Sequence, residues 1–260
     1  MRIATFNIRS GWSMDGWHSW PIRRSATLRA IEDLDADVIG LQEVRGFQLR
    51  WLERRLPDYV ACSGSGRNGG RRGELCPVFV RHGFAASRDV RTRWFGATPD
   101  VAGSRLPGAS HPRIVVLTEL EVSATGQLLQ IANTHLDAAS RSNRRSSATQ
   151  LLGWLDPDLA HVVVGDLNAS PTEESVRLLL QSGLRPALEP GDGGTAHRFR
   201  GGRDGPQIDH ILFSRQWRLV SAGVAAAVSG RLPSDHWPVC AELVLDGAAS
   251  LSQRPQPARP

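Results

Sequence analysis

Short apolar runs rich in β-branched residues recur along this chain, and turn-forming residues bound each of them. Runs of this kind are typical of β-strands, and their shortness favours strands over buried helices. The pattern predicts strands over residues 3–6, 37–41, 76–81, 114–121, 128–132, 162–165, 208–213 and 239–245.

A wider apolar spacing predicts three or four helices, of which three can be placed. The first begins near Pro21, a residue favoured in the first helical turn. The second covers residues 47–56, and the third runs from the capping-box sequence at 170–173 to Gly183. Strands and helices do not alternate strictly, so the pattern predicts an α/β (α+β) fold in which mixed sheets carry helices on their outer faces.

The chain shows no internal repeat and no linker between domains. Its 260 residues suffice for one large α/β domain with a substantial core. We therefore expect a single catalytic domain over residues 1–246. The Pro/Arg/Ser-rich segment 247–260 is expected to be a disordered tail.

Composition places the chain among ordinary globular proteins, with 40% hydrophobic residues and charges of both signs. The net charge is +5, and all 31 basic residues are arginine. These arginines are dispersed, whereas a nucleic-acid surface needs them clustered. Abundant Ala, Gly and Pro beside Arg fit a GC-rich coding bias, which would explain the arginines without a nucleic-acid partner. Nucleic acid stays open as a partner.

The cysteines and the apolar runs bear on the compartment. Cys62, Cys76 and Cys240 are odd in number and lack metal-ligand spacing, which favours small buried side chains in a reducing compartment. No run approaches the roughly eighteen apolar residues of a membrane span, and no signal peptide is visible. We expect a cytoplasmic protein without a transmembrane segment, and secretion of a trimmed form stays open.

Polar side chains stand where the predicted strands stop. A rigid scaffold can aim side chains from strand ends into one shared crevice. Glu43, Asn7 and Asp235 offer two carboxylates and a carboxamide in such positions. Oxygen ligands of this kind suit a hard cation, so we predict these residues as ligands of Mg²⁺, with Mn²⁺ as the other candidate.

The other strand-end residues suit phosphoryl transfer. Asp166 can orient and deprotonate an attacking water. Asn168, His135 and His236 can stabilise charge that develops on the phosphoryl oxygens. Asp209 is the natural carboxylate partner for His236, because it would fix the tautomer and favour the charged ring.

Each of these residues also has an ordinary structural interpretation. Asn and Asp favour turns and helix caps, a lone Glu is commonly a solvated charge, and a lone His is commonly satisfied inside a core. The combination argues for chemistry, because six polar clusters at strand ends occur in one chain.

Taken in order, these clusters resemble the motifs of the endonuclease/exonuclease/phosphatase superfamily. The resemblance runs from about Arg2 to Leu245 and rests on six segments: Thr5-Phe6-Asn7-Ile8-Arg9, Leu41-Gln42-Glu43-Val44, Asn133-Thr134-His135-Leu136-Asp137, Gly165-Asp166-Leu167-Asn168, Ile208-Asp209-His210-Ile211 and Ser234-Asp235-His236. It implies a four-layer sandwich, in which two mixed sheets pack face to face with helices outside, and a Mg²⁺-dependent phosphoester hydrolysis.

The resemblance implies the same division of roles as the residue types. It makes Glu43 the metal ligand with Asn7 and Asp235 nearby, and it assigns catalysis to Asp166, Asn168, His135, Asp209 and His236.

Further segments, at 20–24, 66–74, 94–100 and 195–199, are similar to a bacterial branch of metal-dependent hydrolases. By this likeness Glu74 and Arg113 are expected to bind substrate in the pocket; a surface charge and a salt-bridged arginine are the open alternatives. The chain departs from the branch at Leu167, Ala138, Gly96-Ala97 and His210. None of these departures removes a catalytic group, but they alter the expected substrate contacts.

We therefore predict a monomeric phosphatase or phosphodiesterase that acts on a small or lipid-like phosphorylated substrate by in-line water attack. A Mg²⁺-dependent nuclease acting on DNA or RNA is the alternative, favoured by the arginines. A non-catalytic binding protein on the same fold is the third hypothesis. The loop that carries Trp12, Trp17 and Trp20 can wall a substrate pocket or pack at the core and rim.

Overall fold

The computed structural model describes residues 1–226 and 230–246. The predicted tail at 247–260 lies outside the described residues. The elements are β1 (Arg2–Asn7), a 3₁₀ turn (Gly16–His18), α1 (Trp20–Asp33), β2 (Val38–Gln42), β3 (Val44–Arg45), α2 (Gly46–Glu53), β4 (Tyr59–Cys62), β5 (Glu74–Leu75), β6 (Val78–Arg81), β7 (Ala85–Trp94), β8 (Ile114–Val122), β9 (Leu128–His135), α3 (Arg141–Leu152), β10 (Ala160–Asp166), α4 (Glu174–Gln181), β11 (Arg185–Pro186), β12 (Asp209–Phe213), β13 (Trp217–Val224) and β14 (Val239–Leu245).

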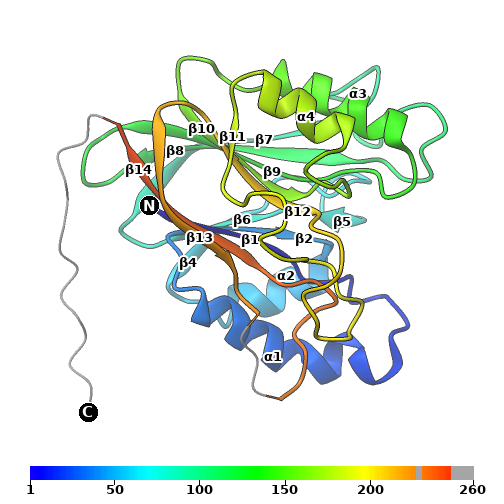
Figure 1. Cartoon of the computed structure of the whole chain (residues 1–260). Helices are drawn as coiled ribbons and strands as arrows, with labels where there is room; N and C mark the ends of the chain where they lie inside the picture. Colours follow the sequence, from blue (N-terminus) through cyan, green and yellow to red (C-terminus); the bar gives the residue numbers. More distant parts are fainter. Residues whose placement is uncertain (227–229, 247–260) are drawn as a thin grey trace, which may run out of the picture.

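Two six-stranded sheets pack face to face, with α1 and α2 on the outside of one and α3 and α4 on the outside of the other (Figure 1). The first sheet has the order β13-β14-β1-β2-β6-β4 and the second β11-β12-β10-β9-β8-β7. Both are mixed, because β1 is parallel to β2 but antiparallel to β14, and β10 is parallel to β9 but antiparallel to β12. The predicted four-layer α/β sandwich is confirmed.

The central strands are buried on both faces, which explains their continuous apolar runs. Successive side chains of a strand point to opposite faces. In β10, Val162 and Val164 enter the layer between the two sheets, whereas Val163 packs beneath α3 and α4. In β2, Val38 faces the layer between the sheets and Ile39 faces α1 and α2.

A polar contact joins the two sheets near the ends of β2 and β9. The Gln42 side-chain amide donates to Asn133 Oδ1 at 2.7 Å. The sheets come close here, because a Cβ added to Gly40 would lie 2.5 Å from the Val164 side chain and 3.0 Å from the Asn133 side chain. A larger residue at position 40 would push apart the strands whose ends carry the site.

The strands predicted from apolar runs are all present, and β14 has the predicted bounds. The predicted start of the third helix is wrong. α4 begins at Glu174, and its N-cap residue Glu173 makes no capping hydrogen bond. The Glu173 carboxylate instead accepts two hydrogen bonds from Arg144, at 2.7 and 2.9 Å, and so ties the start of α4 to α3. Gly183 follows the last turn with a φ of +102°, as expected of a helix-ending glycine.

Among the longer elements, β4, β7, β13 and α3 were not placed from the sequence. β7 and β13 are edge strands with several exposed residues, so they lack a long apolar run. α3 buries the polar side chains of Asn143, Arg144 and Ser147 beside its few apolar ones, which hides its helical pattern. Within residues 1–226 and 230–246, no helix is both long and apolar enough to cross a membrane.

Candidate active site

Four predicted site residues meet at one edge of the sandwich because of the parallel strand pairs. Asn7, His135 and Asp166 are the last residues of β1, β9 and β10, and Glu43 directly follows β2. Strands β1 and β2 are parallel, as are β9 and β10, so each pair brings its carboxyl ends to the same edge. Gly165 permits this arrangement, because a Cβ there would collide with the Thr134 carbonyl.

The antiparallel neighbours bring their amino ends to the same edge. Asp209 begins β12 and stands opposite Asp166 in the register of the two strands. Asp235 and His236 precede β14, which pairs antiparallel with β1. The structure therefore gathers six segments that are far apart in the sequence.

Three non-glycine residues at this edge have left-handed backbone conformations. The φ angles are +57° at Arg9, +60° at Glu43 and +50° at Asn168. Such conformations are uncommon outside glycine and need support from their surroundings. The Ser10 backbone N–H donates to the Glu43 carboxylate at 2.8 Å, and the Asn168 backbone N–H donates to Asp166 at 2.9 Å.

Asp166 lies at the centre of the site, with only 1% of its surface exposed. Its Oδ2 accepts a hydrogen bond from the Asn7 amide at 2.9 Å. Burial, and then the negative charge of Asp209, raises the pKa of Asp166 to about 7. The carboxyl group therefore titrates near neutral pH, as suits a residue that accepts a proton during a reaction.

His236 forms the second charged group of the site. Its Nδ1 lies 2.8 Å from Asp209 Oδ2, and its Nε2 lies 3.9 Å from Asp166 Oδ2. Burial opposes a charge on this ring, but the Asp209 and Asp166 carboxylates outweigh it and raise the pKa of His236 to about 10. The ring is a cation at neutral pH, and both of its nitrogens are donors.

Thr195 fixes the position of Asp209. The Thr195 hydroxyl oxygen accepts hydrogen bonds from the backbone N–H groups of Ile208 and Asp209, at 3.0 and 3.1 Å. The next residue, Ala196, forms a bridge with His236. In the sequence, the segment 195–199 was noted only for its family likeness. In the structure, it supports Asp209 and His236 through Thr195 and Ala196.

His135 stands on the other side of Asp166, with 3.5 Å between its Nε2 and Asp166 Oδ2. Burial, followed by the charges of Arg113 and His236, lowers the pKa of His135 well below its ordinary value. His135 is therefore neutral where His236 is charged. Asn168 is held beside it, because its side-chain amide donates to the Leu136 carbonyl at 3.1 Å.

Glu43 fits the part of a cation ligand. Its two carboxylate oxygens each accept one hydrogen bond, from the Asn7 amide at 3.1 Å and from the Ser10 N–H. No basic side chain of the described residues pairs with this carboxylate, so each oxygen keeps a free lone pair at the cavity. An acidic oxygen donor without a cationic partner suits Mg²⁺ or another hard divalent ion.

Asp235 is placed differently. Its carboxylate lies 3.4 Å from the Arg9 guanidinium, and, like Asn7, it is not among the described residues that line the cavity. Another acidic group, formed by Asp166, Asp209 and His236, has three possible ligand atoms within 4.8 Å. Because His236 is a hydrogen-bonded cation, we favour proton exchange over metal binding for this group.

The site opens into a cavity of about 440 Å³. One part of its lining consists of Glu43, Asp166, Asn168, His135 and His236. Another part, which we call the basic wall, consists of Arg45, Arg67, Arg113, His111 and Glu74. Glu74 and Arg113 thus both line the cavity, where substrate-binding residues were expected.

Three residues of the basic wall, Arg45, Arg67 and His111, were not singled out from the sequence. Arg67 lies in the family-like segment 66–74, and Arg45 follows the Glu43 motif, so a weak signal existed for both. His111 stands in a loop without any recognised pattern. Their common location depends on contacts between distant segments.

The tryptophan loop divides between the two expected roles. Trp20 is buried, with 4% of its surface exposed, and packs edge-on against Trp51. Trp12 is 69% exposed and lines the cavity, and the Arg45 guanidinium lies 4.4 Å from its ring centre. Trp17 is exposed and does not line the cavity.

The sequence and the fold of this chain are similar to those of known proteins. A model of the Endonuclease/Exonuclease/phosphatase family matches residues 4–236. An endonuclease/exonuclease/phosphatase protein from Bacteroides vulgatus is 29% identical, with a TM-score of 0.88 over 94% of this chain and 98% of that one. The mannosyl-6-phosphatase of Bacteroides thetaiotaomicron is 26% identical, with a TM-score of 0.86 over 94% of this chain and 100% of that one.

A more distant likeness concerns the fold alone. D. rerio TDP2, solved with a single strand DNA product, is 15% identical, with a TM-score of 0.74 over 94% of this chain and 98% of that one. Among curated proteins, none matches this sequence.

Proposed function

The chain belongs to the endonuclease/exonuclease/phosphatase family and is a phosphoester hydrolase, and on that premise we propose that it is a Mg²⁺-dependent phosphatase or phosphodiesterase for small phosphorylated substrates. The observation that carries the proposal is the buried Asp166 carboxyl at the cavity, between one neutral and one charged imidazole. A base, a neutral donor and a cationic donor are what water attack on a phosphoester requires.

In the proposed reaction Asp166 accepts a proton from the attacking water, since its pKa of about 7 balances basicity against availability at neutral pH. His236 donates to a phosphoryl oxygen as negative charge grows there. Asp209 keeps that imidazole charged and correctly turned through the 2.8 Å contact with its Nδ1. Asn168 and His135 supply the neutral contacts to the phosphoryl group.

Glu43 and Asn7 would hold the divalent ion, with Asp235 behind them. Bound there, the ion supplies positive charge to the phosphoryl oxygens and orients the phosphoester. Asn7 has a second role. Its amide donates to both Glu43 and Asp166 and so fixes the position of the metal ligand relative to the base. Mn²⁺ has the same ligand preferences and is the alternative ion.

The size of the cavity supports a small substrate. A volume of about 440 Å³ lies within the range of pockets that enclose small molecules. The 26% identical mannosyl-6-phosphatase gives independent support for a phosphorylated small molecule. The three free cysteines support a reducing compartment, and we propose the cytoplasm as the place of action.

The test is hydrolysis by the purified chain of a phosphomonoester, a phosphodiester, a sphingomyelin-type lipid and DNA, each with Mg²⁺, with Mn²⁺ and with EDTA. We expect metal-dependent turnover of the small phosphoesters that changes little with salt. Turnover that is unaffected by EDTA would remove the metal from the proposal. Cleavage confined to DNA and steeply reduced by salt would make the protein a nuclease instead.

A further inference from the structure

The basic wall carries more positive charge than the described residues neutralise. Glu74 is its single carboxylate, and it pairs with Arg67 at 2.7 Å and with Arg45 at 3.1 Å. The pairing between β3 and β5 sets Arg45 opposite Glu74 and so builds this contact into the backbone. Arg113 makes no side-chain hydrogen bond or ion pair with any residue of the described chain, and it lines the same cavity.

Two of the three arginines of the wall, Arg67 and Arg45, are held in place before any ligand binds. Arg67 and Arg45 keep only 11% and 13% of their side-chain surfaces exposed. Arg45 Nε also donates to Ser10 Oγ at 2.9 Å, and its guanidinium lies over the Trp12 ring. A guanidinium that is already ordered loses little entropy when it binds an anion.

Burial and the positive charges of this wall lower the pKa values of two histidines, His111 and His135. Burial and then the charges of Arg67 and Arg113 lower the pKa of His111. Arg113 and Arg67 contribute in the same direction at His135, after burial. Both imidazoles line the cavity, so the charges of Arg67 and Arg113 act on a proposed catalytic residue as well as on the basic wall.

We propose that the basic wall binds a second anionic group of the substrate, a phosphate or a carboxylate on the leaving group, with Arg113 as its main contact. The proposal rests on the proposed function, because it assigns the part of the substrate that the catalytic residues do not hold. Arg113 supplies a free guanidinium fork for two oxygen atoms, and Arg67 and Arg45 add fixed charge beside it. Glu74 is then a positioning residue for the two arginines.

A small substrate with two anionic groups fits this wall better than a nucleic-acid strand does. A strand needs a track of free cationic groups along the surface. Several arginines outside the cavity are instead paired with carboxylates, as are Arg81 with Asp35, Arg88 with Glu121 and Arg145 with Glu174. Arg113, which has no ion-pair partner among the described residues, faces a cavity of only about 440 Å³.

The experiment compares phosphomonoesters with and without a second anionic group. With Mg²⁺ and the full chain, kcat/KM is measured for glucose 6-phosphate, glucose 1,6-bisphosphate and 6-phosphogluconate, and for AMP and adenosine 3′,5′-bisphosphate. We expect the second anion to raise kcat/KM by about tenfold or more on at least one scaffold, as a charge-assisted hydrogen-bonded contact does. The bisphosphate and the carboxylate of the glucose series tell the two anion sources apart.

The variant Arg113→Ala is expected to remove most of that preference, and Arg113→Gln to do the same with less change in volume. Arg113→Lys should restore part of it, because it returns the charge without the fork. Arg91→Ala is the matched control, since Arg91 lies outside the cavity and is expected to leave every rate unchanged. Thermal melts of all variants verify that they are folded.

The outcomes separate the two proposals. Metal-dependent turnover without a preference for a second anion on either scaffold would overturn this inference and leave the proposed function standing. An equal loss on all substrates in Arg113→Ala would also overturn it, because Arg113 would then hold the scissile phosphate. A higher kcat/KM for a single-stranded oligonucleotide than for any dianion would replace the leaving-group subsite with a strand-binding one. No metal-dependent turnover of any phosphoester would remove the proposed function itself.

Discussion

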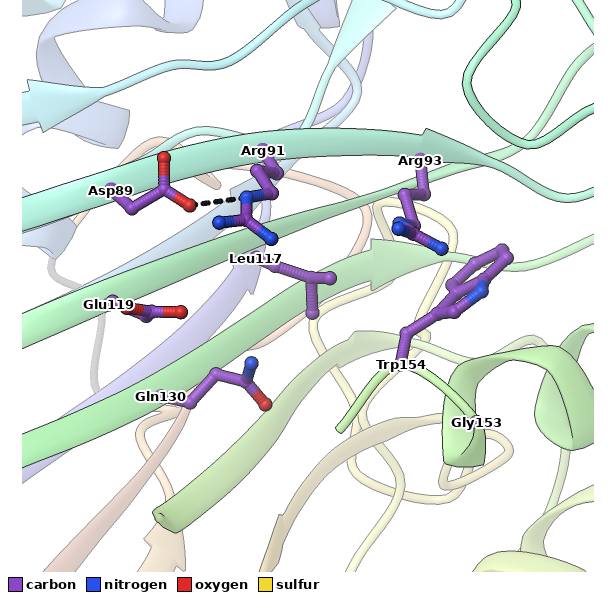
Figure 2. Close-up of a pocket in the computed structure, with 8 residues that line it drawn as sticks. All are labelled: Asp89, Arg91, Arg93, Leu117, Glu119, Gln130, Gly153 and Trp154. Atoms are coloured by element: carbon purple, nitrogen blue, oxygen red, sulfur yellow. Dashed lines mark ion pairs between the residues drawn. The ribbon is translucent and has the colours of Figure 1, made fainter. Parts of the chain in front are cut away.

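Two hollows of this molecule both contain arginines and carboxylates but differ in how these side chains are held. The proposed catalytic cavity lies at the strand ends, and a smaller hollow of about 160 Å³ lies on the outer face of the second sheet (Figure 2). In the smaller one, Asp89 pairs with Arg91 two residues away on β7, and Arg93 lies over the Trp154 ring. The Arg91 and Asp89 side chains are 64% and 37% exposed.

At the strand ends the carboxylates of Asp166 and Asp209 are buried, with 1% and 0% of their surfaces exposed. Asp166 is held by Asn7 and by the Asn168 backbone, and Asp209 pairs with a buried imidazole. Burial strengthens charge interactions, whereas solvent screens an exposed pair. Of the two hollows, the one at the strand ends also has histidines in its lining, and among the described residues the outer one has none. We expect burial and anchoring to make the charged side chains at the strand ends reactive, whereas those of the outer hollow stay solvated.

The largest effect is expected from Asp166→Asn, which removes the proposed base from the catalytic cavity. We expect kcat to fall about a thousandfold, as for the loss of a general base. The fold should persist, since Asn can accept the same backbone N–H bond. Steady-state kinetics with Mg²⁺ measures the loss, and turnover near the wild-type rate would mean that another group accepts the proton.

The same variant is expected to change how stability depends on pH. The folded pKa of Asp166, about 7, exceeds its ordinary value of 3.8, so its ionisation works against folding as pH rises between these values. In EDTA, the Tm of Asp166→Asn relative to the wild type should therefore increase from pH 4 to pH 7. A Tm difference independent of pH would contradict the buried, perturbed carboxyl.

Asp209→Asn is expected to lower kcat about a hundredfold, because His236 loses the partner that keeps it charged. With burial then unopposed by Asp209, the pKa of His236 should drop from about 10, and the ring should become largely neutral at pH 8. An NMR titration of ¹³C-labelled histidine measures that pKa. An unchanged His236 pKa would show that Asp166 alone sustains the charge.

Glu43→Gln should raise the Mg²⁺ concentration for half-maximal activity by at least about tenfold, because it removes a charged ligand. The kcat at saturating Mg²⁺ should change less than in Asp166→Asn. A metal titration of activity provides the measurement, and the control is the same titration of Asp89→Asn, whose carboxylate lies in the outer hollow. Identical titrations of Glu43→Gln and the wild type would reject the ligand assignment.

Thr195→Val removes the oxygen that accepts two backbone N–H groups beside Asp209. A destabilisation of about 2 kcal/mol is expected from these buried donors, with a smaller loss of kcat than for Asp209→Asn. Urea unfolding measures the loss of stability, and steady-state kinetics measures the loss of kcat. Thr195→Ser keeps the hydroxyl and should retain both properties, and a Ser variant as impaired as Val would assign the effect to packing.

The smallest effect is expected from Arg91→Ala in the outer hollow. The exposed ion pair with Asp89 should contribute less than about 0.5 kcal/mol to folding, and kcat should not change. Urea unfolding and a single rate measurement are sufficient. A loss of activity as large as in Glu43→Gln would mean that the outer hollow takes part in function.

Most of the fold was predictable because each central strand carries its own signal. The β-branched runs at β2, β8 and β10 are local, and their burial on both faces makes them continuous. The signal fails where burial is partial, as in the edge strand β7, or where the buried side chains are polar, as in α3. The capping-box prediction at 170–173 failed because Arg144, from a different helix, binds Glu173.

The residues able to do chemistry can be identified from the sequence, because Asn7, Glu43, His135 and Asp166 each end an apolar run that marks a strand. Their charge states and the make-up of the basic wall depend on the tertiary structure. The pKa values of Asp166 and His236 depend on burial and on Asp209, which pairing between β10 and β12 brings alongside. Arg45, Arg67 and Arg113 belong to separate segments, and electrostatic interactions follow distance in space rather than distance along the chain.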